Sequence, residues 1–196
     1  MIDLSNKNSK MKKMGYAAAL TKAWEDLANL KPANNLAVKF LADEYSVDLT
    51  GKRVLSLSCN SAAKDWLSII ILHYAVKKLQ GLPKPTGEWL TFREFSGVEG
   101  YADAFRQRAL GPIIRKYGKN PEAIKTVLER LPAELIPGGD FAIILQAFAG
   151  VPVLVKLWKA DTEFGPDANM YFDSSITGIF CTEDIVVLAG IIGSSL

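Results

Sequence analysis

The sequence predicts an α+β fold: a single domain with a mostly antiparallel sheet and N-terminal, central and C-terminal helices. Apolar residues recur at helical spacing in some segments and alternate in others, and the two kinds of segment come in blocks rather than in strict alternation. The 196 residues suit one domain with a sizeable core. Because no repeat or low-complexity linker divides the chain, we expect one domain over residues 1–196.

The N-terminal segment is basic and leads into a helix. The lysines are Lys7, Lys10, Lys12 and Lys13. They precede an apolar stretch that is short and runs directly into charged residues, which is unlike a secretory signal. We therefore expect residues 1–13 to form a flexible lead. From Met14 to Leu30 the apolar residues have helical spacing, and Pro32 follows, so an amphipathic helix is predicted there.

Three short β-prone segments come next, at residues 36–42, 44–50 and 52–58. Their spacing and the Thr50-Gly51 pair between the last two are typical of an antiparallel meander. A long helix is expected to follow, capped by Asn60 or Ser61 and ending near Leu79, before Gly81.

One face of that central helix is expected to be apolar, and it includes the only histidine of the chain. Its members are Trp66, Ile69, Ile70, His73 and Val76. We therefore expect His73 to point inward.

The next segments alternate in type. Residues 87–95 alternate as a strand would, residues 101–110 are helical, and Gly111-Pro112 bends or restarts that helix. Asn120-Pro121 is typical of a further helix start.

A hairpin and a buried helix are expected in the last third of the chain. Residues 141–148 and 151–158 flank Ala149-Gly150, and Pro152 confines the start of the second strand to an edge or a bulge. The last helix opens at Thr182, with two acids favourable against its N-terminal dipole. Its apolar residues run all around, which predicts burial.

Charge is unevenly distributed although the formal net charge is only +2. Residues 101–130 carry seven basic groups, whereas residues 160–196 carry six acids and no base. Such an asymmetry can steer an anionic ligand or bring two copies together head to tail as a homo-oligomer. The basic residues are dispersed and not interleaved with aromatics, so we expect a solvated helix face and no nucleic-acid partner. The apolar C-terminal stretch is too short for a membrane span, and we expect a cytoplasmic protein.

Cysteine usage limits the metal chemistry. Cys59 and Cys181 are the only cysteines and lie far apart, so this chain alone provides neither an iron–sulfur cluster nor a structural zinc site. A phosphate loop, a dinucleotide-binding glycine motif, a His-Glu-x-x-His motif and a nucleophile elbow are all absent.

Acidic residues concentrate in residues 159–175. They do not keep the register of a calcium loop. At the end of a strand Asp161 and Glu163 would point to the same face, and burial together would raise the pKa of one carboxyl, as an acid–base pair requires. Asp173 precedes two serines and is equally compatible with turn chemistry.

Several segments together resemble the domain-of-unknown-function 3786 family. They are ILHY (71–74), GEWLTFREF (87–95) followed by Tyr101 and Phe105, LWKADTEFGPDANMYFD (157–173) and the TED before the last helix. The resemblance covers roughly residues 36–190. It implies an anaerobic bacterial or methanogenic archaeal setting, because the family occurs there, and some members are joined to iron–sulfur modules. This chain lacks cluster cysteines, so a cluster would belong to a partner.

The positions that carry the resemblance are expected to line a shared site or to hold shared structure. They are His73, Arg93, Tyr101, Asp161, Glu163 and Asp173.

Three functions are compatible with these observations. The first is a cytoplasmic binding protein for a bulky cofactor, a corrinoid or other tetrapyrrole, in anaerobic redox or one-carbon metabolism, with His73 as axial ligand. The second is a small enzyme with Asp161 and Glu163 as acid and base and Arg93 holding an anionic substrate. The third is a docking subunit for an iron–sulfur partner protein.

Overall fold

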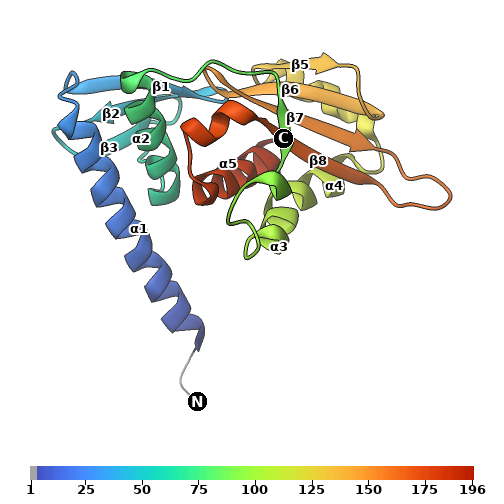
Figure 1. Ribbon diagram of the computed structural model, residues 1–196, viewed down its shortest axis with the longest axis horizontal. Helices are drawn as coiled ribbons and strands as arrows, with labels where there is room; N and C mark the ends of the chain where they lie inside the picture. The colour runs from blue at the N-terminus through green and yellow to red at the C-terminus, as the bar shows by residue number, and fades with distance from the viewer. Residues whose placement is uncertain (1–3) are drawn as a thin grey trace. The chain divides into compact units, whose positions relative to one another are not determined.

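The computed structural model describes residues 4–196 of the chain (Figure 1). Its secondary structure comprises α-helices, short 3-10 and π segments, and two antiparallel sheets of three and five strands, which confirms the predicted α+β class. The chain forms two compact units. The first runs up to Val38 and continues over Asp43–Gly81, and the second comprises Lys39–Ala42 and Leu82–Leu196. The prediction of a single domain remains a prediction.

The first unit opens with a helix longer than the sequence predicted. α1 (Leu4–Asn29) begins ten residues before the expected start, so the expected lead is helical from Leu4 on, and its first three residues lie outside the described part. The helix ends before Pro32 as expected. Trp24 and Leu27 are buried on its face toward α2 (Asp65–Gln80).

The predicted meander is present in the first sheet, whose strand order is β1-β2-β3: β1 (Asn35–Phe40), β2 (Asp43–Asp48) and β3 (Arg53–Ser56). The predicted cap of α2 is wrong by three or four residues, since Lys64 is the residue before the helix: Asn60 has φ of 50°, and Ala62 forms a bridge with Leu55. The chain is thus still paired with β3 where the cap was expected. The helix ends at Gly81, whose φ of 102° confirms the predicted glycine stop.

The second unit is built on a five-stranded antiparallel sheet of order β4-β8-β7-β6-β5 (Figure 1). Its strands are β4 (Trp89–Thr91), β5 (Ala133–Ile136), β6 (Phe141–Phe148), β7 (Val151–Trp158) and β8 (Asp167–Asp173). The β6–β7 hairpin has the predicted bounds, and Pro152 stands beside a bulge as predicted. β5 and β8 were not predicted from the sequence. The predicted strand over residues 87–95 is reduced to β4.

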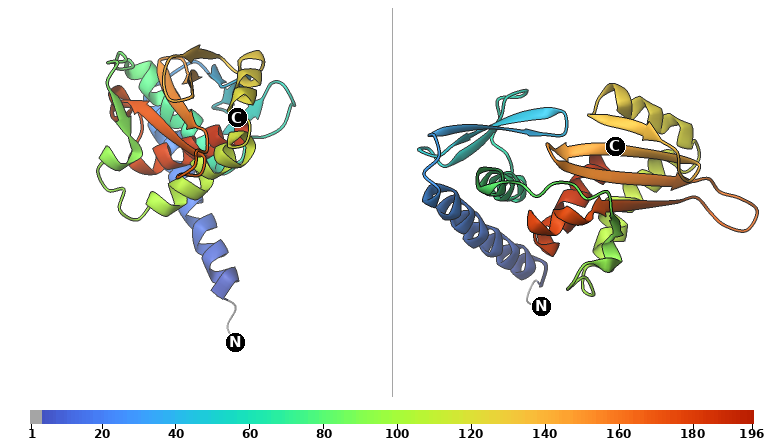
Figure 2. Two further views of the ribbon diagram at one scale, coloured as in Figure 1. Left: turned by 90° about the vertical axis from the view of Figure 1, so that its right-hand side faces the viewer. Right: turned by 45° about the horizontal axis from the view of Figure 1, so that its top comes forward.

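Helical segments cover one face of this sheet (Figures 1 and 2). They are η1 (Phe92–Glu94), α3 (Ala102–Phe105), a π-helical segment η2 (Arg106–Leu110), α4 (Gly111–Tyr117), η3 (Pro121–Glu129), η4 (Ser174–Gly178) and α5 (Thr182–Ser195). The helical stretch from residue 101, its restart at Gly111 and the helix start at Asn120 agree with the prediction, and α5 is largely buried as expected.

The π-helical segment is held by close contact with α5. A Cβ atom on Gly193 would lie 2.1 Å from the carbonyl oxygen of Ala109, so only glycine allows the two backbones to approach this closely. Ala109 itself is fully buried. The packing of α5 therefore fixes the position of the segment that follows α3.

We predict that Gly193→Ala lowers the free energy of unfolding by about 3 kcal/mol, because the new methyl group meets backbone and not a flexible side chain. Gly190→Ala is the matched control on the same helix: its Cβ would lie at an ordinary 3.6 Å from Cβ of Arg108, and alanine favours a helix interior. Urea denaturation of both variants measures the difference. Equal stability of the two would contradict the contact.

Candidate functional site

A hollow of about 370 Å³ lies beside the first residues of β8 in the second unit. We call it the β8 groove. Its lining comes from the end of β4 and η1, from α3 and the π-helical segment, and from β8: Thr91, Phe92, Arg93, Ala102, Asp103, Phe105, Arg106, Leu110, Asp167, Ala168 and Asn169.

The groove exists because β4 is much shorter than β8. The register pairs Thr91 with Tyr171, and no β4 residue pairs with residues 167–170. The chain leaves the sheet there because the Glu94 carboxylate accepts hydrogen bonds from the backbone N–H of Thr91 (2.6 Å) and from its hydroxyl (2.7 Å). This cap starts η1, which then borders the gap.

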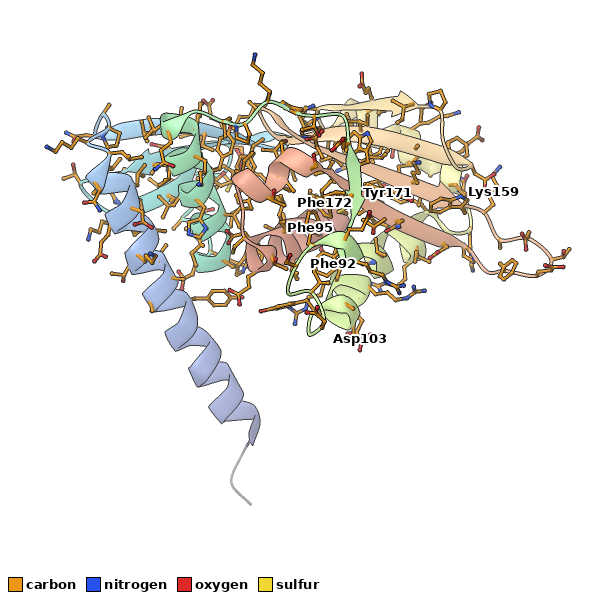
Figure 3. All side chains as sticks on the ribbon, viewed as in Figure 1. Phe92, Phe95, Asp103, Lys159, Tyr171 and Phe172 are labelled. Atoms are coloured by element: carbon orange, nitrogen blue, oxygen red, sulfur yellow. The ribbon has the colours of Figure 1, made fainter. Side chains whose placement is uncertain are left out.

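Aromatic rings form the inner wall of the groove. Phe92 and Phe105 stack with centroids 4.2 Å apart and an interplanar angle of 5°, and both are buried. Leu110 and Ala168 are buried beside them. Figure 3 shows Phe92 close to the end of β4, with Asp103 on α3 beyond it. A wall already packed in this way is pre-formed for a planar or apolar group.

The rim of the groove carries both signs of charge, all on exposed side chains: Arg93, Arg106, Asp103 and Asp167. Within the described part of the chain, none of the four makes an ion pair or a hydrogen bond. Arg106 is the first residue of the π-helical segment, and π turns of this kind frequently occur at functional sites.

A second hollow, of about 600 Å³, adjoins the groove and lies under the loop between β7 and β8. We call it the loop hollow; its lining residues are Asp140, Trp158, Lys159, Ala160, Asp161, Phe164, Gly165, Asp167 and Asn169. Asp167 and Asn169 line both hollows. A third hollow, of about 570 Å³, shares Lys159 and Ala160 with the loop hollow. Figure 3 labels Lys159 where this loop begins.

Asp161 and Glu163 lie in this loop and are both exposed. The Asp161 carboxylate accepts hydrogen bonds from the backbone N–H groups of Phe164 (2.7 Å) and Glu163 (2.8 Å), and these bonds lower its pKa. Asp161 and Glu163 are thus not buried together, as the predicted acid–base pair requires. Asp161 forms the turn of the loop.

Asp173 is a structural anchor at the end of β8. It is 1% exposed, and its carboxylate accepts hydrogen bonds from backbone N–H groups of Thr86 (3.0 Å to each oxygen), Gly87 (2.7 Å) and Ser175 (3.0 Å). Burial acts to raise its pKa, but these bonds outweigh burial and lower the pKa to about 2. The sequence left two interpretations of Asp173 open, a residue of a shared site or a residue that stabilises a turn.

The other two expected residues lie outside the hollows. The Tyr101 hydroxyl donates to Glu183 at 2.7 Å, which raises the pKa of Tyr101 and joins the start of α3 to the start of α5. His73 belongs to α2 in the first unit, is only half-buried rather than fully inward, and lines none of the three hollows. Of the six expected residues, Arg93 alone lines the groove, and Asp161 lines the loop hollow.

The other residues that line the groove were not among the site residues predicted from the sequence. Arg106 was counted only as one of the dispersed basic residues, and Asp167 only as part of an acidic segment. The alternation of Ala168, Met170 and Phe172 with polar residues was the signal that could have identified β8 and hence the position of Asp167.

Among the described residues, no group of three or more histidine, cysteine, aspartate or glutamate side chains is arranged so that it could hold a metal ion. The helices found among them also include none with the length and apolar character needed to cross a membrane.

We predict that Asp173→Asn lowers the free energy of unfolding at pH 7 by about 2 kcal/mol, because the pKa of the native carboxyl lies below its ordinary value of 3.8. That stabilisation is present above about pH 4 and is lost as the pH falls through the folded pKa of about 2. Denaturation of both proteins between pH 7 and pH 2 should show the difference shrinking at the acid end. A difference that is constant with pH would contradict the role of the charge.

Comparison with known proteins places this arrangement in a family. Neither the curated proteins nor the solved structures include a significant match to the chain. The family model described as "Domain of unknown function (DUF3786)" matches residues 23–194, which span both units and every residue that lines the groove. The chain therefore belongs to the DUF3786 family.

Proposed function

We propose that the second unit binds a small molecule with an anionic group and an apolar body, and that it does so in the β8 groove. The observation that carries this proposal is the pair of guanidinium groups, Arg93 and Arg106, which have no partner in the described chain and line the same hollow as the stacked rings of Phe92 and Phe105.

The chemistry of the lining supports this ligand class. A guanidinium presents several donors in a planar fork that matches a carboxylate or a phosphate. The aromatic wall removes apolar ligand surface from water at no ordering cost, because the rings are already packed against each other. The volume of about 370 Å³ lies in the range of small-molecule sites.

A corrinoid or other tetrapyrrole also combines acidic side groups with an apolar ring, but it is bulkier than a groove of about 370 Å³. His73 is not part of the groove lining, so axial ligation by His73 is not part of this proposal. The tetrapyrrole, its setting in anaerobic redox or one-carbon metabolism and the cytoplasmic location remain predictions. The acid–base enzyme and the docking subunit remain predictions as well.

We predict that 1-naphthyl phosphate binds about tenfold more tightly than the uncharged 1-naphthol, because charge-assisted hydrogen bonds to one or both guanidinium groups are added to the same apolar contact. Arg93→Ala and Arg106→Ala should each remove most of that difference. Isothermal titration calorimetry at low ionic strength measures it, and added salt should weaken the phosphate alone.

Arg115→Ala is the matched control, because Arg115 is also exposed on the adjoining α4 but does not line the groove. Equal affinities for the two naphthyl compounds would overturn the proposal. A parallel titration with haem or a corrinoid, followed by visible absorbance, tests the tetrapyrrole. A spectral shift lost in His73→Ala and kept in Arg93→Ala would place ligand binding elsewhere.

A further inference from the structure

We infer that the ligand of the β8 groove is a zwitterion: besides its anionic group it carries a protonated amine, which the carboxylates of Asp103 and Asp167 bind. The inference rests on the proposed function, because it assigns the anionic group to Arg93 and Arg106. It adds the second charge of the ligand and therefore its chemical class, a compact amino acid with an apolar or aromatic side chain.

The first support is that the opposite charges on the rim do not neutralise each other. Asp103 and Arg106 are three residues apart on one helical stretch, a spacing at which opposite charges can pair. Glu122 and Lys125 have the same sequence spacing on the 3-10 helix η3 and do pair, at 3.1 Å. Asp103 and Arg106 form no such pair, and the change from α3 to the π-helical segment occurs between them.

The second support is that carboxylates oppose the binding of a simple anion. A groove for an anion alone would be weakened by Asp103 and Asp167, since like charges repel across a small hollow. The same carboxylates become favourable when the ligand also carries an ammonium group. A zwitterion thus uses all four charged side chains of the rim.

The third support is the position of Asp167. It lines both the β8 groove and the loop hollow, and its register partner on β7, Trp158, lines the loop hollow. An ammonium group bound at Asp167 therefore lies beside a second hollow that Trp158 also lines. The groove volume of about 370 Å³ suits a ligand of the size of one aromatic amino acid.

Three related probes separate the charges: L-tryptophan, indole-3-propionate, which lacks the amine, and tryptamine, which lacks the carboxylate. We expect L-tryptophan to bind at least about fivefold more tightly than either of the others in calorimetric titrations, a modest ratio because the four side chains are exposed. Asp103→Asn and Asp167→Asn should each reduce the affinity for L-tryptophan toward that for indole-3-propionate.

The variants also distinguish the two proposals. The Asn variants should keep or raise the affinity for indole-3-propionate, whereas Arg93→Ala should lower it. Glu129→Gln is the control, an exposed carboxylate of the same unit outside the groove, and should change nothing. Circular dichroism confirms that each variant is folded.

Three results would overturn the inference. If indole-3-propionate binds as tightly as L-tryptophan, the amine is not recognised, and the anion site stands without the zwitterion. If L-tryptophan does not bind while 1-naphthyl phosphate does, the zwitterion inference fails alone. Failure of 1-naphthyl phosphate to bind more tightly than 1-naphthol removes the proposed function and the inference with it.

Discussion

The buried carboxylate of Asp173 is the constraint on which the groove depends. It holds the backbone of Thr86 and Gly87 against the end of β8, directly before β4 begins. A hydrogen bond from the backbone N–H of Ser174 to the carbonyl of Glu88 continues the same pairing. These contacts set the β4–β8 register, and the register decides which residues of β8 remain beside the gap.

The groove then combines a rigid wall with charges that have no fixed partner. The wall belongs to the core, since Phe105 and Phe95 also contact Phe172 edge to face at 6.4 and 5.8 Å. The charged groups stand on short elements at the border of that core: η1, α3, the π-helical segment and the first residue of β8. A rigid apolar surface with charges around it orients a ligand by its polar ends and holds it by its apolar body.

Much of the fold follows from local sequence patterns. The β6–β7 hairpin and α5 were predicted because periodicity and turn residues lie within each segment. The start of α2 was misplaced because pairing with β3, the strand just before it, overrides the capping signal: the backbone N–H of Ser56 donates to the carbonyl of Ser61, and that of Ala63 donates to the carbonyl of Val54. β8 was missed because its acidic ends gave it the composition of a loop.

The site was less predictable than the fold. Arg93 was found through the family resemblance, but Asp103 and Arg106 meet Asp167 only in the folded unit, where β4 pairs with β8, and no single segment contains that information. His73 has the spacing of an inward position on α2, yet spacing alone does not determine how far a side chain is covered.

The four residues Lys39–Ala42, at the turn between β1 and β2, belong to the second unit. Leu41 donates its backbone N–H to the carbonyl of Ala147 at 2.8 Å, and the rings of Phe40 and Phe148 lie 4.7 Å apart. The second unit is therefore discontinuous in sequence, and one of its contacts closes a loop of roughly a hundred residues, which costs chain entropy. A fragment beginning at Leu82 would leave the ring of Phe148 without this neighbour, so the second unit is not a separable module that a simple truncation can isolate.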